Sequence, residues 1–219
     1  MGPGKSPSTE PLLNLLPNIF RKDLKNMGDP LTVAISLGCL SRLCTEDLAQ
    51  ILYKDLIPLY AASKSLVRRK VSALSCKVFI HCPDAIPELI PHLCDRLRDS
   101  KTGVQISAVT AIHEISRLNP RLFLVAIPNL FELLNTTKSN WLIIKLIKLV
   151  RSFNLKFQFI EFLPVEPRLY PKLRQKYKEL LIDQRAKSVE FELIKAVVCT
   201  FKNDTQDDKE VQNLAREKL

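Results

Sequence analysis

Glycine is scarce in this chain: its 219 residues include only 5, and two of these, Gly2 and Gly4, lie at the N-terminus. Nucleotide-binding folds need glycine where the backbone approaches phosphate, and β-rich folds need it in tight turns. The scarcity therefore argues against both classes. Leucine, by contrast, occupies 36 positions, which favours helices, and 14 prolines must then separate one helix from the next.

Long apolar runs are also missing. The longest, Leu122–Pro128, is too short to cross a bilayer, and no apolar region follows Lys5 as it would in a secretory signal. Met1-Gly2 with Ser6 fits the loose pattern for myristoylation, but Pro3 is a poor context for it. The six cysteines form no CxxC pair, so we expect free thiols in the reducing cytoplasm rather than disulfides.

Catalytic motifs are absent from the sequence, which has no G-x-S-x-G, P-loop, GxGxxG or H-E-x-x-H. His113 and Glu114 are adjacent, and adjacent residues on a helix do not face each other. Five soft-metal ligands have the spacing C-x4-H-C-x9-H-x-C, which no standard zinc site uses, so packed thiols are favoured over a metal: Cys76, His81, Cys82, His92 and Cys94. We therefore expect no enzyme, no cofactor and no metal.

A repeat of about 37 residues is present instead. Val67, Val104 and Trp141 each open an apolar stretch and are spaced by 37 residues. The same interval separates Pro83 from Pro120 and Pro91 from Pro128, and an earlier, less regular unit covers 30–64. Two of the stretches carry apolar residues at i, i+4, i+7/8 and i+11, the spacing of one helix face: Val67, Val71, Leu74, Val78 and Val104, Ala108, Ile112, Ile115.

Repeated helix pairs of this length are typical of an all-α fold, the α-solenoid of HEAT or armadillo type. A plain helical bundle with accidental spacing is the alternative. We expect second helices at 86–97 and 122–134, with further helices at 170–182 and 188–201. Residues 1–11 should be disordered, residues 12–201 should form the solenoid, and the charged residues 202–219 should be a weakly ordered tail.

One segment breaks the helical pattern. Residues 154–162 read NLKFQFIEF, in which Leu155, Phe157 and Phe159 alternate with polar residues as in a strand. We interpret these residues as an irregular insertion: either an apolar flap that packs on the solenoid, or a retained intron that the functional protein lacks. Sequencing transcripts across residues 152–164 distinguishes the two.

Positive charge is concentrated in residues 138–187, which hold twelve Lys or Arg against four Asp or Glu, or +8 of the formal +10. The candidate contacts for an anionic surface are Lys145, Lys148, Arg151, Lys172 and Lys176. They suit anionic lipid headgroups or an acidic protein, and a merely solvated face is the alternative. Nucleic acid is not expected, because no aromatic residues alternate with the cations to stack on bases.

Several segments resemble the trunk of adaptin large subunits: NIFRKDL (18–24), ISLGCLSRL (35–43), VRRK (67–70) and Asp47-Leu48. SNWLIIKLIKL (139–149), followed by PVEPRL (164–169), is similar to the delta type found in adaptor protein complex 3. The resemblance covers about Leu12 to Phe201. It departs from the family where the chain lacks the first trunk helices, the rest of the trunk, the hinge and the ear, and where 154–162 is inserted.

The resemblance implies a non-enzymatic subunit of a vesicle coat adaptor, which acts in protein transport between Golgi or endosomes and lysosome or vacuole. It implies a sigma-type small subunit and a beta-type large subunit as partners. It also implies a cytoplasmic location, peripheral on Golgi or endosomal membranes or on coated vesicles. No cargo site can be placed on this sequence from it. The rival interpretations are another HEAT-type scaffold, such as a transport receptor, and a nucleic-acid-binding solenoid.

Overall fold

The computed structural model describes residues 15–117, 119–157, 169–183, 185–201 and 205–218. All regular structure in these ranges is helical, and the chain divides into two compact units, Met1–Arg96 and Leu97–Leu219. Each unit is described by itself. The predicted disorder of residues 1–11 lies outside the described residues.

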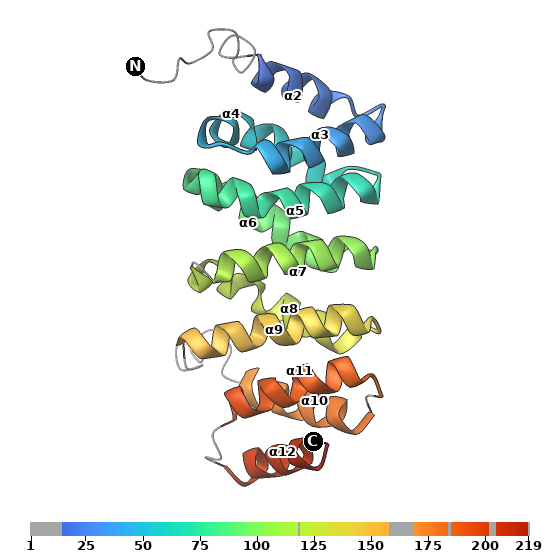
Figure 1. Ribbon diagram of the computed structural model, residues 1–219, viewed down its shortest axis with the longest axis vertical. Helices are drawn as coiled ribbons and strands as arrows, with labels where there is room; N and C mark the ends of the chain where they lie inside the picture. The colour runs from blue at the N-terminus through green and yellow to red at the C-terminus, as the bar shows by residue number, and fades with distance from the viewer. Residues whose placement is uncertain (1–14, 118, 158–168, 184, 202–204, 219) are drawn as a thin grey trace, which may run out of the picture. The chain divides into compact units, whose positions relative to one another are not determined.

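In the first unit, helices of alternating length form two layers (Figure 1). The longer helices α3 and α5 pack side by side, and α5 also contacts α4, η1, η2 and α6. The elements in chain order are α2 (Leu16–Lys25), α3 (Pro30–Leu43), α4 (Glu46–Leu56), η1 (Ile57–Ala61), α5 (Ser65–His81), η2 (Pro83–Ala85) and α6 (Ile86–Asp95).

In the second unit, α9 lies between α7 and α11, and α12 packs against α10 and α11 (Figure 1). The elements, starting at the junction of the units, are η3 (Arg96–Arg98), α7 (Thr102–Ser116), η4 (Pro120–Ala126), α8 (Ile127–Thr136), α9 (Asn140–Phe157), α10 (Leu169–Asp183), α11 (Lys187–Thr200) and α12 (Gln206–Glu217). Helix pairs therefore recur in both units, as predicted.

Helix ends carry the expected local signals. The Asp29 side chain caps α3 by accepting hydrogen bonds from the backbone N–H groups of Leu31 and Thr32, and Pro30 occupies the first turn. Thr45 caps α4 in the same way. The prolines that were expected at corners, Pro83 and Pro120, open the 3-10 helices η2 and η4. These short helices turn the chain from a long helix into a short one.

The 37-residue repeat is most regular between α5 and α7. In α5 the buried residues are Val67, Val71, Ser72, Leu74, Ser75, Val78 and Phe79. In α7 the buried residues stand 37 positions further on at every one of these places: Val104, Ala108, Val109, Ala111, Ile112, Ile115 and Ser116. The two helices therefore present the same face to their neighbours.

The next step of the repeat differs from the prediction by one residue. Trp141 should be buried as the counterpart of Val104, but it is 60% exposed, and Leu142 is fully buried instead. The buried face of α9 thus follows α7 at an interval of 38, since Leu142, Leu146 and Ile147 take the places of Val104, Ala108 and Val109. Pro91 and Pro128 are not equivalent either, because Pro91 lies inside α6 and Pro128 in the first turn of α8.

From α9 to α11 the interval grows to 47, since Val189, Leu193 and Ile194 take the places of Leu142, Leu146 and Ile147. The nine positions added to the preceding interval of 38 fall between Ile147 and Val189, a stretch that contains the predicted insertion. The predicted strand is wrong for residues 154–157, which continue α9 to Phe157. Residues 158–162 lie outside the described residues.

The structure also differs from the prediction of a weakly ordered tail. Residues 206–217 form α12, whose N-terminus is capped by the Thr205 side chain. Val211 and Ala215 are buried, at 1% and 2% exposure. Its charged residues suggested a solvated segment, but several of them are paired with α10, as described below.

The shift of one residue gives a stability prediction. Leu142→Ala should lower the free energy of unfolding by about 2–5 kcal/mol, because it opens a cavity in a packed core. Trp141→Ala should change it by less than about 0.5 kcal/mol, because the ring is largely in water. Urea unfolding of both variants measures these changes. If Trp141→Ala lowered the free energy of unfolding more than Leu142→Ala, Trp141 would be the buried residue and the repeat interval would be 37.

Candidate interaction surface

The predicted cations lie on two helices of the second unit. Lys145, Lys148 and Arg151 follow one another along α9, and Lys172 and Lys176 lie on α10. Because both flanks of α9 are buried against α7 and α11, only a narrow stripe of it reaches solvent. Long side chains suit such a stripe, because their stems cover apolar surface while their charges stay hydrated.

Two of these cations converge on one carboxylate. Glu192 of α11 lies 3.6 Å from Lys148 Nζ and 3.5 Å from an Arg151 guanidinium nitrogen, and its side chain is only 12% exposed. Lys195 adds a more distant contact at 4.0 Å. The contacts are ion pairs rather than short hydrogen bonds. Glu192 therefore neutralises part of the stripe and joins α9 to α11.

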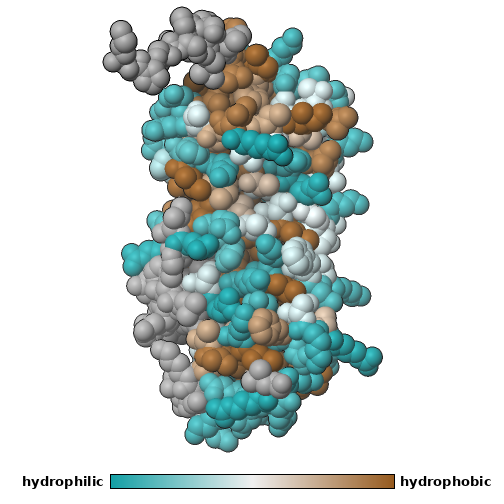
Figure 2. Space-filling model, viewed as in Figure 1, coloured by the Kyte–Doolittle hydropathy of each residue, from teal (hydrophilic) through white to brown (hydrophobic). Residues whose placement is uncertain are grey.

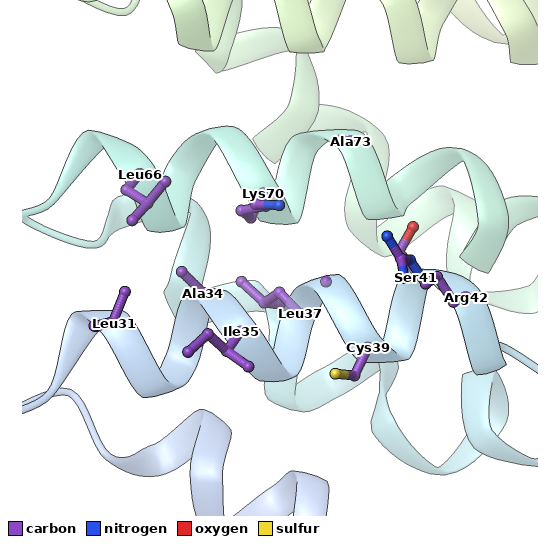
Figure 3. Close-up of a pocket in the computed structure, with 11 residues that line it drawn as sticks. Leu31, Ala34, Ile35, Leu37, Cys39, Ser41, Arg42, Leu66, Lys70 and Ala73 are labelled. Carbon is purple, nitrogen blue, oxygen red and sulfur yellow. The ribbon is translucent and has the colours of Figure 1, made fainter.

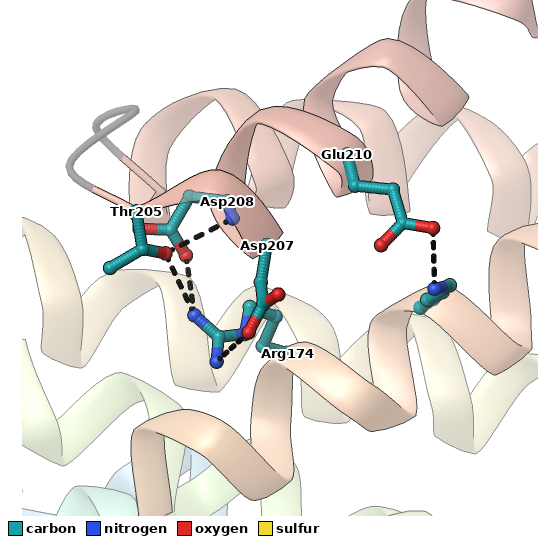
Figure 4. Close-up of polar contacts among 6 residues, drawn as sticks. Arg174, Thr205, Asp207, Asp208 and Glu210 are labelled. Carbon is teal, nitrogen blue, oxygen red and sulfur yellow. Dashed lines mark hydrogen bonds and ion pairs between the residues drawn. The ribbon is translucent and has the colours of Figure 1, made fainter.

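The basic side chains of α10 are engaged as well (Figure 4). Arg174 contacts Asp207 at 2.8 Å and Asp208 at 3.1 Å, and it also donates a hydrogen bond to the Thr205 hydroxyl. Lys178 donates to Glu210 at 2.6 Å. Asp208 is only 1% exposed, and the Arg174 guanidinium beside it offsets the cost of burying a carboxylate. The first turns of α12 are therefore attached to α10 by ion pairs between side chains.

The remaining predicted residues differ in their surroundings. Lys176 lies 3.9 Å from Glu179, one turn along the same helix, and Lys172 is exposed. Lys145 makes no ion pair within the described residues, and its Nζ lies 5.8 Å from the ring centroid of Trp141. A similar pair stands on α11, where Lys195 Nζ lies 4.0 Å from the ring centroid of Phe191. Such cation–π contacts are weak where water has access.

Exposed hydrophobic residues accompany these lysines, although their exposure was not predicted from the sequence. Trp141, Phe191 and Val198 are 60%, 55% and 66% exposed. Brown side chains are visible at the level of α11 in Figure 2. The spacing of these residues could have indicated a shared surface. Phe191, Lys195 and Val198 occur at i, i+4 and i+7 and therefore share one face of α11. The surface thus combines cations with apolar groups.

His113 of α7 borders this surface. Burial lowers its pKa, Glu114 raises it, and the charges of Lys145, Arg117 and Lys148 lower it further. Its Nδ1 lies 3.7 Å from a Glu114 carboxylate oxygen, so the expectation that these neighbours do not meet is wrong.

The candidate metal ligands lie in the first unit and show the features of packed side chains. Cys82 and Cys94 are buried, and burial raises the pKa of the Cys94 thiol to about 11. The His92 ring stacks on Tyr60, with ring centroids 5.9 Å apart. In the described ranges, no group of three or more His, Cys, Asp or Glu residues is placed to hold a metal ion.

These features indicate the class of protein: a helical-repeat protein whose exposed helix faces offer contacts to other molecules. The fold agrees with a designed armadillo-repeat protein for modular peptide recognition, a crystal structure that covers 92% of the chain with a TM-score of 0.61. Because the identity is only 19%, this likeness shows the fold alone. The prediction of an all-α solenoid is confirmed.

The family follows from the sequence comparisons. The profile of the adaptin N-terminal region matches residues 6–218, so the chain belongs to this family, as its resemblance indicated. The AP-3 complex subunit delta of Schizosaccharomyces pombe is 35% identical over 192 residues, which are 88% of this chain and 22% of that relative. A homology model of the full-length AP-3 complex in an intermediate open conformation matches with a TM-score of 0.78 and 32% identity, over 95% of this chain and 35% of that one. The chain thus spans about a fifth of that relative's length.

The ion pairs of Glu192 with Lys148 and Arg151 predict that this carboxylate contributes to stability. Glu192→Gln should lower the free energy of unfolding by about 1–3 kcal/mol, because Lys148 and Arg151 lose their counter-charge in a half-buried site. Glu179→Gln is the matched control, since this carboxylate is 49% exposed, and its effect should stay below about 0.5 kcal/mol. Equal effects in denaturant unfolding would show that Glu192 does not join the helices.

His113 predicts a pH dependence. Its folded-state pKa lies below its usual value of 6.5, so the unfolded state binds more protons below that pH. Stability should therefore fall as the pH drops below 6.5, and it should fall less in His113→Gln. Melting temperatures of both proteins between pH 7.5 and 5 measure the difference. Parallel curves would contradict the prediction.

Proposed function

We propose that this chain is a segment of the delta-type large subunit of an AP-3-like coat adaptor. In this role it is a non-enzymatic interaction protein of vesicle-mediated protein transport between Golgi or endosomes and lysosome or vacuole. The observation that carries the proposal is the 35% identity to an AP-3 delta subunit over 88% of the chain. The likeness to the AP-3 complex model, at a TM-score of 0.78, supports the same subunit assignment.

We propose two protein partners, a sigma-type small adaptor subunit and a beta-type large adaptor subunit. Stacked helix pairs suit this role, because they present successive helix faces along an extended surface. Trp141 and Phe191 offer large apolar groups of the kind that dominate interface energies, and both stand beside a lysine. Such surfaces favour partners that are apolar at the centre and acidic at the rim.

Assembly tests this function. The chain should be co-expressed with the sigma-type and beta-type subunits of the same organism, and the complex analysed by size-exclusion chromatography and light scattering. We expect the chain to elute with at least one of them in a defined ratio. Substituting a small subunit from a different adaptor complex is the control, and it should bind less. If the chain elutes alone beside its cognate subunits, the assignment is wrong.

A peripheral membrane location is part of the proposal. No helix in the described ranges is long and apolar enough to cross a membrane. Contact with anionic lipid would then depend on surface cations, and the structure divides those that were predicted from the sequence. Lys148 and Arg151 are engaged by Glu192, whereas Lys145 has no acidic partner in the described ranges. Lys145 is therefore the residue of α9 best placed to meet an anionic lipid.

Vesicle binding tests the membrane contact. Changing Lys145, Lys148, Arg151, Lys172 and Lys176 to Gln should weaken binding to phosphatidylserine vesicles by orders of magnitude, at about 1 kcal/mol for each cation near the leaflet. Because Glu192 pairs with Lys148, Lys145→Gln alone should account for a larger share than Lys148→Gln. Flotation at two salt concentrations measures both. Unchanged flotation would mean that the cations are merely solvated.

A further inference from the structure

A groove lies between α3 and α5 of the first unit, whereas the surface described above belongs to the second unit. It has a volume of about 550 Å³ (Figure 3). Its wall on α3 includes Leu31, Ile35, Cys39 and Arg42, and its wall on α5 includes Leu66, Lys70 and Ala73. Leu31 and Ile35 are 61% and 57% exposed, so two large aliphatic groups stand in water at its edge.

Small residues open this groove. Ala34 and Gly38 on α3 and Ala73 on α5 lie where larger side chains would fill the space between the helices. A Cβ atom added at Gly38 would meet Lys70 Nζ at 3.7 Å, so the Lys70 ammonium lies above the glycine. Glycine inside a helix costs about 1 kcal/mol relative to alanine, and here its lack of a side chain lets the Lys70 ammonium lie at the floor of the groove.

The side chains that line the groove include cations and no carboxylate. Neither α3 nor α5 contains any Asp or Glu, although together they carry Arg42, Arg68, Arg69, Lys70 and Lys77. Arg68 donates hydrogen bonds to the carbonyls of Ala62 and Ser63 and thus faces elsewhere. Arg42 and Lys70 line the groove and have no acidic partner within the described residues. On α9 and α10, by contrast, the cations are largely neutralised.

Apolar and cationic groups are separated along the groove. In Figure 3, Leu31 and Leu66 lie together at one end, where α3 and α5 both begin. Arg42 lies toward the other end, and Lys70 lies between them on α5. From Leu31 to Arg42 the groove follows eleven helical steps, about 16 Å at 1.5 Å per residue. A ligand that fits must therefore be apolar at one end and anionic at the other.

We propose that this groove docks an acidic peptide segment of a protein partner, with aliphatic side chains near Leu31 and Ile35 and carboxylates at Arg42 and Lys70. A segment of about three helical turns matches its length, as in other complexes where an amphipathic helix occupies a groove. A flat lipid surface fits less well, because Lys70 is recessed over Gly38 whereas Arg69 and Lys77 project from α5. The docking of such a segment goes beyond the adaptor assembly proposed above.

Selection from a random library of displayed twelve-residue peptides tests the inference on the complete chain. We expect the recovered peptides to combine acidic and aliphatic residues. Their affinity, measured by fluorescence anisotropy, should fall at least tenfold for Arg42→Glu combined with Lys70→Glu, and about fivefold for Ile35→Ser. Lys77→Glu, on the same helix but outside the groove, should change the affinity less than twofold.

Gly38→Leu provides a second variant that does not weaken the helix, since leucine has the higher helix propensity. It should fill the floor of the groove and reduce peptide binding at least tenfold while the melting temperature is kept or raised. Recovered peptides that bind all of these variants equally would overturn the inference. The inference would also be overturned if Arg42→Glu and Lys70→Glu weakened binding to phosphatidylserine vesicles but left the binding of every peptide unchanged.

Discussion

The burial of one apolar face on each long helix is the constraint on which the rest of the structure depends. No helix of this length covers its own apolar face, so α9 is stable only between α7 and α11. The places of the buried residues also decide which residues remain outside. When the face of α9 shifts by one residue relative to α7, Leu142 enters the core and Trp141 turns to solvent. A surface feature thus follows from a packing requirement.

The role of each charged side chain in this protein depends mainly on whether an opposite charge lies beside it. Residues 138–187 carry a large positive excess, but Glu192, Asp207, Asp208 and Glu210 follow them in the chain and fold back on α9 and α10. The excess is therefore used partly to attach α11 and α12. The first unit has fewer cations in its groove, yet Arg42 and Lys70 face no carboxylate there. Whether a cation can bind a partner molecule therefore depends more on its ion pairs within the chain than on how many cations lie nearby.

These properties agree with a protein whose work is to hold other chains. The adaptin family assignment, the exposed Trp141 and Phe191 and a groove lined without carboxylates are consistent with the scaffold role proposed above. Packing between helix pairs keeps such surfaces in place, and each surface is set by a few side chains on two neighbouring helices. Substitutions on one helix face can therefore alter one contact while the core remains intact.

Much of the fold could be predicted from local sequence. The apolar spacing around Val67 and Val104 requires helices, and Pro83 and Pro120 require corners after them, because proline cannot continue a helix without losing a hydrogen bond. The helical repeat rests on these signals, whereas the adaptin resemblance rests on sequence segments such as SNWLIIKLIKL (139–149). The continuation of α9 through residues 154–157 was missed, because a short alternation of apolar and polar residues does not override the helix that precedes it.

The interaction surface needed the tertiary structure. Whether Lys148 meets solvent or Glu192 depends on how α9 packs on α11, which is distant in the sequence, and no local pattern encodes that contact. The groove likewise forms only when Gly38 of α3 comes to face Lys70 of α5. The sequence by itself determined the helices and their repeating order, since these follow from short-range spacing. Packing between distant residues decided which charges and apolar groups stay free, because burial and ion pairing are properties of neighbours in space.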